Sequence, residues 1–546
     1  MKLIRGLLLA AASVLAGSLI IPGHWPVSTA PTATAPLDDV TVFAFSQSNP
    51  GDSGDPQVLQ LKPDSIIRGW GRWDRDGIQA SDYNSAYLKA CQAAGVRFVG
   101  GTTASVLFPD ETANPGQLAD WATRDAAGNM VLHPNGTFSY YRGSLANPGY
   151  RDYLIRIGRI QIDLGVDGIF FDELSGDYQG ANYDGDEGFD DYHIADFASF
   201  LASQSALPGD LAAQLRPSPE SRNAWRQGAG FNYRNWLAQH GWSANPFTPD
   251  NPLAALWGMP DVRHPAPGAN DFMDLAEPYL YWRQIASELR AYAKEKYGRD
   301  ILLTSNGVWP LTDFQGVGLY DYNNDGPGGG DVDFCPLTST GDLDGTQTFQ
   351  SAFTNLRDIS AQLAPGAPVV LFIDWPTPLM DRYNGLPPSE RQDYWRMYVA
   401  EAYANGIFFA FHLKTTTGEP TATQAGVMPL FQSLAAFYRA HASFYHGETP
   451  STANATVSAP GAMISVMDQT GPNRRLVHIV NHQYNAGFIA QPNVTVTVDA
   501  AAAPASVTLS SPDLAQDEAA TYSWANGQLS VTLPSLVAYD VVAISW

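Results

Sequence analysis

The chain has 546 residues, too many for one ordinary domain, and 45% of them are apolar, which is ample for a large core. Its 31 Lys and Arg against 55 Asp and Glu give a formal charge of −24. This acidity excludes nucleic acid as a partner, because nucleic-acid binding needs a basic surface, and it disfavours anionic membranes. The 12% of aromatic residues is compatible with sugar binding through ring stacking, although a large aromatic core explains it more simply.

Residues 1–36 have the pattern of an export signal followed by a linker. Lys2 and Arg5 precede the apolar run GLLLAAASVLAGSLIIP, and small, Pro-rich residues follow it. This pattern predicts cleavage after one of the alanines between residues 30 and 35, with an uncleaved membrane anchor as the alternative. We therefore expect a secreted or periplasmic protein with no membrane segment after cleavage. In that compartment Cys91 and Cys335 either form a disulfide or stay as two buried thiols.

Residues 37–445 alternate between short apolar runs and amphipathic stretches. Eight runs predict strands: VTVFAFS, SIIRGWG, VRFVGGTT, GIFFDE, ILLTSNG, VDFCPLT, PVVLFIDW and IFFAFHL. Most are continuous, which is typical of strands buried on both faces. Stretches such as GYRDYLIRIGRIQIDLG between them have helical spacing. Eight strand–helix units predict an α/β fold, the (β/α)8 TIM barrel. For the sixth strand, GVGLYDYNND competes with VDFCPLT.

A long insertion, about residues 175–270, follows the fourth strand. Loops at the carboxyl ends of barrel strands build the active site, so the insertion is expected to form a substrate-facing wall or lid. Its aromatic residues either line that wall or fill a small core of the insertion itself. They are Trp225, Tyr233, Trp236, Trp242 and Trp257.

The segment NYDGDEGFDD within the insertion carries five carboxylates between Asp184 and Asp191. They either hold a structural calcium ion, which prefers oxygen ligands, or form a solvated acidic loop. We expect no other cofactor, because there is no Cys/His cluster for zinc and no Gly-rich phosphate loop.

The chain changes character near residue 445. Residues 446–546 hold short β-rich runs such as RRLVHIVNHQ and NVTVTVDA, separated by turn residues and without helical period. This pattern predicts a small antiparallel β-sandwich domain.

Carboxylates follow several of the predicted barrel strands. Asp172 and Glu173 end the fourth strand, Asp374 ends the seventh, and Asp321 lies in the segment near the sixth. Glycoside cleavage needs two carboxyl groups, one ionised as nucleophile or base and one protonated as acid. Nearby like charges and partial burial can move the pKa values of two such carboxyl groups apart, so that one is ionised while the other is protonated. Burying a charged group is costly, so carboxylates are expected at these strand ends because they face substrate and water there. The strand ends are therefore the expected catalytic positions.

The expected contacts to a sugar are polar and aromatic side chains near the same rim. They are Arg142, Tyr141, Asn306, Trp309, Tyr320, Trp375 and His412.

The segment GVDGIFFDE resembles the fourth-strand signature of TIM-barrel glycoside hydrolases, namely the dextranase/cycloisomaltooligosaccharide glucanotransferase group and the α-amylase-like group. Their pattern is Asp-Gly, three residues, then the nucleophilic Asp, here Asp167-Gly168 and then Asp172. The lead-in HPNGTFSYYRGSLANPGYRDYL and the C-terminal runs LVHIVNHQY and LPSLVAYDVVAI also resemble that group. The resemblance implies that Asp172 is the nucleophile.

The sequence departs from these families at the other positions of their motifs. Phe170 stands where α-amylase-like enzymes carry Arg, strand five ends Ser305-Asn306-Gly307 without Glu, and no Glu follows strand six. The acid is therefore not carried over from the resemblance. Asp374 and Asp321 are the candidates, followed by Glu173, which instead orients a neighbour if strand alternation holds.

We therefore expect a secreted glycoside hydrolase that cleaves a poly- or oligosaccharide by a retaining mechanism through Asp172, with carbohydrate as its partner. The resemblance implies α-linked substrates. An inverting mechanism on the same carboxylates, a transglycosylase, and a non-catalytic glycan-binding protein are the alternatives.

Overall fold

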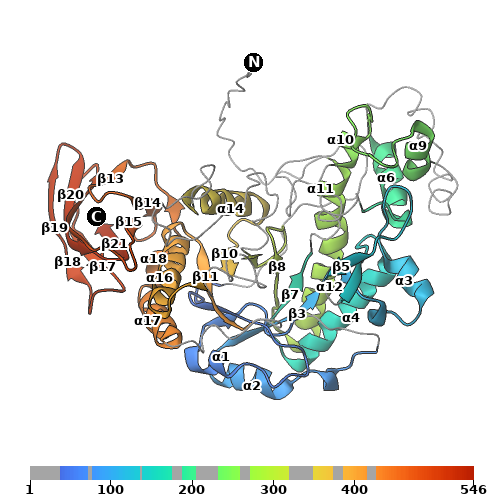
Figure 1. Cartoon of the computed structure of the whole chain (residues 1–546), viewed down its shortest axis with the longest axis horizontal. Coiled ribbons are helices and arrows are strands. Elements are labelled where there is room, and N and C mark those ends of the chain that lie inside the picture. Colours follow the sequence, from blue (N-terminus) through green and yellow to red (C-terminus); the bar gives the residue numbers. More distant parts are fainter. Residues whose placement is uncertain are drawn as a thin grey trace.

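The computed structural model describes residues 37–71, 77–135, 138–174, 187–204, 231–258, 271–318, 349–372, 385–414 and 426–546. Figure 1 shows a central barrel, with the C-terminal sandwich (red) on one side and the helices of the insertion (green) on the other. Among the helices in these ranges, none combines the length and apolar character that crossing a membrane requires.

Eight parallel strands close into a barrel in the order β1-β11-β10-β9-β8-β7-β3-β2. They are β1 (Phe43–Ser46), β2 (Ser65–Ile66), β3 (Arg97–Thr103), β7 (Gly168–Asp172), β8 (Leu302–Asn306), β9 (Phe314–Gly318), β10 (Val369–Phe372) and β11 (Phe408–Lys414). All residues of β1, β7, β8 and β10 are buried, as continuous apolar runs in a parallel sheet should be. The (β/α)8 prediction is confirmed.

The sixth barrel strand is β9, not the predicted VDFCPLT, so that prediction is wrong. β9 lies between β8 and β10, with Gln315 opposite Val369, and residues 332–338 lie outside the described ranges. The competing segment GVGLYDYNND holds the second half of this strand. The apolar pattern missed it because Gln315 is polar yet fully buried. Its amide oxygen accepts from the Trp309 N–H at 2.8 Å and its amide nitrogen donates to the Trp309 carbonyl at 2.8 Å, which satisfies it inside the fold.

Helices cover the outside of the barrel. They are α1 (Pro56–Leu61), α2 (Ser85–Ala93), α4 (Pro148–Leu164), α12 (Arg283–Tyr297), α14 (Phe349–Leu363), α16 (Pro388–Ala404) and α17 (Val427–Ala440), with the 3-10 turn η1 (Ala80–Asp82) before α2. The helix before β7 shows how the sequence sets these bounds. The Asn147 side chain caps α4, Pro148 occupies its first turn, and Gly165 ends it at φ 98°.

The connection from β3 to α4 carries a small three-stranded sheet in the order β4-β6-β5. Its elements are β4 (Val106–Leu107), η2 (Pro109–Glu111), α3 (Pro115–Trp121), β5 (His133–Asn135) and β6 (Phe138–Arg142). Because this connection leaves the carboxyl end of β3, it places the last residue of β6, Arg142, at the rim beside β7.

The described part of the insertion consists of short helices around an aromatic core. They are α6 (Asp191–Ser203), α9 (Tyr233–His240), α10 (Ala254–Trp257) and α11 (Phe272–Ala276), followed by the π-helix η3 (Glu277–Trp282), which continues into α12. The Trp257 ring stacks on Phe189 with centroids 4.6 Å apart, and Tyr233 packs on Trp257 at 5.1 Å.

Of the two alternatives for these aromatic residues, Tyr233 and Trp257 follow the second, since both are 0% exposed in the insertion's own core. Trp236 and Trp242 are partly buried against His240, and Trp225 lies outside the described residues. The spacing of aromatic residues in the sequence does not distinguish a substrate-facing wall from a small separate core, so the sequence left both alternatives open.

After α18 (Ala442–Tyr445) the chain forms two antiparallel sheets, in the orders β12-β14-β15-β21-β17-β18 and β13-β16-β20-β19. The strands are β12 (Thr449–Pro450), β13 (Ala455–Val457), β14 (Ala462–Gln469), β15 (Arg474–Asn481), β16 (Gln491–Asp499), β17 (Ser506–Ser510), β18 (Glu518–Ala519), β19 (Thr521–Ala525), β20 (Gln528–Leu536) and β21 (Tyr539–Ser545). A core of Val, Leu and Ile from both sheets fills the space between them. The predicted sandwich is confirmed.

Cys91 lies buried on α2 as a free thiol, and burial raises its pKa to about 11. A thiol that is protonated at neutral pH is a poor nucleophile, so Cys91 is a packing residue. Cys335 lies outside the described residues.

Candidate active site

Asp172 is the last residue of β7, and its side chain is 11% exposed at the carboxyl end of the barrel. Its Oδ2 accepts a hydrogen bond from Nη2 of Arg68, whose side chain is 4% exposed. Arg68 follows β2, and β3 lies between β2 and β7, so this ion pair crosses over a strand. A guanidinium in hydrogen-bond contact with a carboxyl group favours the ionised form of that group.

Arg68 is itself held in place by two further contacts. Its guanidinium carbon lies over the Phe170 ring, 5.3 Å from the centroid. The Gln47 amide oxygen, turned toward Arg68, accepts from Nη2 at 2.8 Å and from Nε at 3.1 Å. An aromatic residue at position 170 therefore supports an arginine that comes from another strand.

Sequence reasoning missed Arg68. The signal that could have found it is the single cation in the apolar run SIIRGWG, directly after β2. A lone charge in a buried strand needs a partner of opposite charge. Carboxylates stand at the ends of other strands on the same rim, so Arg68 could have been paired with one of them.

Glu173 follows β7 directly and has a left-handed backbone, at φ 52°. Its N–H donates to Oδ1 of Asn306 at 2.5 Å, and its carbonyl accepts from Oγ of Ser105 at 2.5 Å. A non-glycine residue in this region costs about 1–2 kcal/mol, so these two bonds must hold the turn. The turn breaks strand alternation after Asp172 and directs the Glu173 carboxylate toward Arg142.

Arg142 forms an ion pair with Glu173 and is 5% exposed. Its guanidinium lies over the Tyr140 ring at 5.2 Å. Burial alone would lower the pKa of Arg142, but the Glu173 carboxylate raises it above its ordinary value. The structure engages Arg142 in positioning the Glu173 carboxylate, and its predicted contact to a sugar stays a prediction. Asn306 is likewise buried and uses its side-chain oxygen for the Glu173 backbone.

Two further predicted sugar contacts are buried elsewhere. Trp309 is 0% exposed and sits behind β9, hydrogen-bonded through its backbone to Gln315. His412 is 2% exposed between the rings of Phe45 and Trp395, and burial lowers its pKa to about 4. Both side chains point into the packed interior, so neither is accessible to a sugar.

Tyr141 is half-buried on β6, beside Arg142. Asp374, Asp321, Tyr320 and Trp375 lie outside the described residues. The structure thus brings together Asp172, Glu173, Arg142 and Asn306 from the predicted set and adds Arg68.

One more carboxylate near the rim has a structural role. Asp55 follows β1, is 1% exposed, and caps α1 by accepting from the Gln57 N–H at 2.9 Å and from Oγ of Ser46 at 2.8 Å. Burial raises its pKa, but both of its oxygens are engaged, so Asp55 supports the helix start.

The described carboxylates of the acidic insertion loop each have a protein partner. Glu187 binds His133 at 3.0 Å, Asp190 binds His193 at 2.5 Å, and Asp191 pairs with Arg234. Among the residues that the structure describes, no group of three or more His, Cys, Asp or Glu could hold a metal ion. Asp184 and Asp186 lie outside these residues, and the calcium site stays a prediction.

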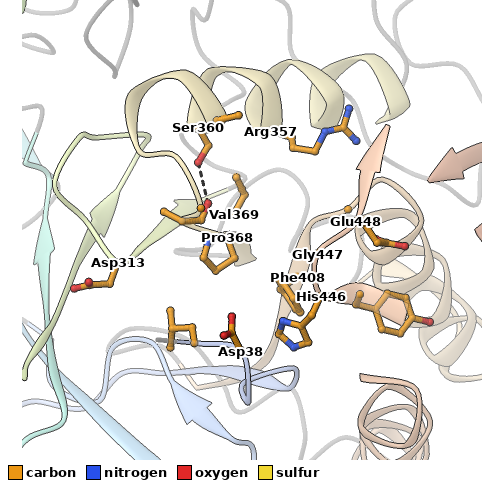
Figure 2. A pocket seen from close by; sticks show the side chains of 16 residues that line it. Asp38, Asp313, Arg357, Ser360, Pro368, Val369, Phe408, His446, Gly447 and Glu448 are labelled. Carbon is orange, nitrogen blue, oxygen red and sulfur yellow. Dashed lines mark hydrogen bonds between the residues drawn. The ribbon is translucent and has the colours of Figure 1, made fainter. Parts of the chain in front are cut away.

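A cavity of about 360 Å³ lies at the opposite end of the barrel (Figure 2). Pro368 and Val369 at the start of β10, Gly406 and Phe408 at the start of β11, and His446 at the sandwich junction line it. The amino ends of barrel strands serve stability, whereas catalysis uses the carboxyl ends. This cavity is therefore separate from the Asp172 site.

No family model matches the sequence, and no curated protein does. Among solved structures, a cycloisomaltooligosaccharide glucanotransferase from Paenibacillus sp. has a TM-score of 0.52 at 10% identity, covering 93% of this chain and 85% of its own. The alpha-L-fucosidase isoenzyme 2 from Paenibacillus thiaminolyticus has a TM-score of 0.50 at 9% identity, covering 93% and 100%. At such identities these likenesses establish a shared fold, which includes the expected likeness to the glucanotransferase group.

Proposed function

We propose that the protein is a secreted glycoside hydrolase that cleaves α-linked poly- or oligosaccharides by a retaining mechanism. The observation that supports this most is the Asp172 carboxylate at the carboxyl end of β7, ion-paired to the buried Arg68. The same rim is where barrel enzymes carry out their chemistry. Two structures that share the fold carry the names of a glucanotransferase and a fucosidase, both of which act on sugars.

In the proposed reaction, the ionised Asp172 attacks the anomeric carbon while the glycosidic bond breaks. An acid protonates the departing oxygen, and water, activated by the same group, then releases the sugar from the Asp172 ester with retained configuration. Asp374 and Asp321 are the candidates for the acid/base. Glu173 is the weaker candidate, because its carboxylate is already engaged by Arg142, an ion pair that shapes the end of the strand.

A transglycosylase on the same site is the second candidate, since one solved structure of this fold is named as a glucanotransferase. The two activities differ in whether water or a sugar hydroxyl accepts the glycosyl group from Asp172.

A screen against linkage-defined glycans tests the proposal. Reducing-end release with an α-anomer as the first product supports retaining hydrolysis, and longer or cyclic products at high glycan concentration support transfer. An inverted first product contradicts the retaining mechanism. Binding with no turnover of any α-linked glycan, in protein that is folded by circular dichroism, contradicts the catalytic assignment.

Replacing Arg68 with Met is expected to lower kcat about 10²-fold with a smaller change in KM, because Arg68 positions Asp172 without reaching the sugar. The acid limb of the pH–rate profile should move to higher pH, since the anion loses the cation that favours it. Steady-state kinetics from pH 4 to 8 measure both effects.

Arg68→Lys is the matched variant for this prediction. It keeps the charge but loses the planar fork that reaches both Asp172 and Gln47, so its pH profile should stay close to wild type while kcat falls less. Equal pH profiles for wild type and Arg68→Met would show that Arg68 serves packing alone.

A further inference from the structure

The barrel and the sandwich meet along α16, α17 and β15, which lie side by side in Figure 1. Two histidines face carboxylates across this junction. The charged or titratable groups that the structure places around it are Arg357, Glu390, Asp393, Arg396, Glu401, His441, His446, Glu448, Arg474, His478, His482, Asp513, Asp517 and Asp540.

One cross-domain pair joins His482, just after β15, to Glu401 on α16. Glu401 is 0% exposed, and its Oε1 binds Nε2 of His482. On the same helix, the Asn405 amide donates to the Glu401 carbonyl at 2.8 Å. A fully buried carboxylate without a cation would be costly, so the imidazolium form of His482 stabilises the contact.

Two other histidines contact carboxylates near the junction, one within the sandwich and one across the two domains. Nε2 of His478 on β15 lies 3.0 Å from Oε1 of Glu448, which precedes β12, and the His478 Nδ1 lies 2.8 Å from the Tyr539 hydroxyl. At the end of α17, Nε2 of His441 lies 2.9 Å from Asp517 in the sandwich. The His441–Asp517 contact therefore joins the barrel to the sandwich, whereas the His478–Glu448 pair lies within the sandwich.

A buried acid on the sandwich side adds to this trend. Asp540 on β21 is 2% exposed, and its Oδ2 has no hydrogen-bond partner among the described residues. Close by, Asp513 forms an ion pair with Arg396 of α16. Burial, with the Asp513 charge adding to it, raises the pKa of Asp540 to about 7. Ionisation of Asp540 would place a second negative charge beside the Asp513–Arg396 contact.

We propose that the junction between barrel and sandwich is a pH-sensitive clasp. Its His482–Glu401 pair holds the two domains together most firmly in mildly acidic medium, and the hold weakens as His482 loses its proton. The proposal does not depend on the enzymatic activity.

The direction in which the stability of the clasp changes with pH follows from the pKa shifts of its individual groups. Burial alone would lower the pKa of His482, but the Glu401 carboxylate raises it above its ordinary value. Its contribution is therefore full below the unfolded value near 6.5 and is lost as pH rises through the folded pKa. His446, which bonds Oγ1 of Thr41 at 3.0 Å, has its pKa lowered by burial and acts oppositely below about pH 6.5. The clasp therefore weakens in the window above about pH 6.5.

Thermal unfolding of the full chain at pH 6.0 and 9.0 tests the clasp through His482→Gln. The variant should unfold about 2–4 °C below wild type at pH 6.0, and within about 1 °C of it at pH 9.0, where wild-type His482 is neutral as well. A deficit of equal size at both pH values would show that His482 contributes packing only, and would overturn the proposal.

Glu401→Gln gives an independent reading, because it removes the buried charge rather than its cation. It should unfold below wild type at pH 6.0 and at or above wild type at pH 9.0, where Glu401 has lost its charged partner. An unchanged offset contradicts the clasp. His240→Gln is the control. His240 is exposed on α9, where its ring packs on Trp236 and Trp242 and its Nδ1 bonds the Trp236 carbonyl, so the offset of this variant from wild type should be the same at both pH values.

Asp540→Asn mimics the protonated acid and should stabilise the protein selectively at high pH. Because the folded pKa of about 7 lies above the unfolded value near 3.9, wild type loses stability as pH rises from about 4 to 7. The variant should therefore gain about 2–4 °C over wild type at pH 9.0 and nothing at pH 4.5. A gain that does not change with pH would contradict the assigned role of Asp540.

Discussion

Asp172→Asn is expected to reduce kcat on the preferred glycan at least about 10⁴-fold while the protein stays folded and still binds the glycan. An amide oxygen is a far weaker nucleophile than a carboxylate, so the glycosyl ester does not form. The change is nearly isosteric. Because Arg68 can still donate to the amide oxygen, the local structure should persist. Initial rates together with a binding isotherm for the same glycan measure the two effects.

Asp167→Asn is the matched control, since Asp167 belongs to the same Asp-Gly-x-x-x-Asp motif. Its Oδ2 accepts from the Phe98 N–H at 2.8 Å and from Nε2 of Gln92 at 2.9 Å, a structural arrangement at the amino end of β7. This variant should lose some stability but keep the kcat of the folded enzyme. Comparable losses of kcat in both variants would mean that the motif serves folding and that Asp172 is not the nucleophile.

His193→Leu is expected to lower the free energy of unfolding by about 3–5 kcal/mol, the largest stability effect that we foresee. The His193 ring is 0% exposed, with Nδ1 at 2.5 Å from Asp190 and Nε2 at 2.6 Å from Glu277. It joins α6 of the insertion to η3 at the start of α12. Removing it leaves two buried carboxylates without their shared cation. Urea unfolding followed by circular dichroism measures the loss.

Adding Asp190→Asn and Glu277→Gln to His193→Leu separates charge from packing. If the uncompensated carboxylates cause the loss, neutralising them should recover at least half of it. No recovery would assign the effect to lost packing. The wild-type interaction has a defined pH dependence as well. Burial alone would raise the pKa of Asp190, but His193 lowers it, so its contribution is present above about pH 4 and is lost as pH falls through the folded pKa.

The fold was largely predictable from sequence because barrel strands are buried on both faces and announce themselves as apolar runs. The helix caps around α4 are equally legible, from Asn147-Pro148 at one end to Gly165 at the other. Prediction failed at β9, where Gln315 is buried and pays no penalty because Trp309 provides both of its hydrogen bonds. Trp309 lies close to Gln315 in space, but the hydrophobic periodicity of the sequence does not show that the two residues are paired.

The candidate site was predictable only for residues defined by strand ends. Asp172 followed from an apolar strand that ends in an acid, whereas the role of Arg142 depends on a left-handed turn at Glu173, which sequence does not announce. Arg68 was missed because its partner lies two strands away in the barrel. Trp309 and His412 were misplaced because a polar or aromatic residue near a strand end can turn inward and be packed there.

Trapping the covalent intermediate identifies the nucleophile directly. Incubation with an activated 2-fluoro analogue of the preferred α-linked sugar, followed by peptide mass spectrometry, should place one glycosyl group on the peptide that contains Asp172, with loss of activity in proportion to labelling. A label on another carboxylate, or full turnover of the analogue through an inverted product with Asp172 unmodified, would contradict the account.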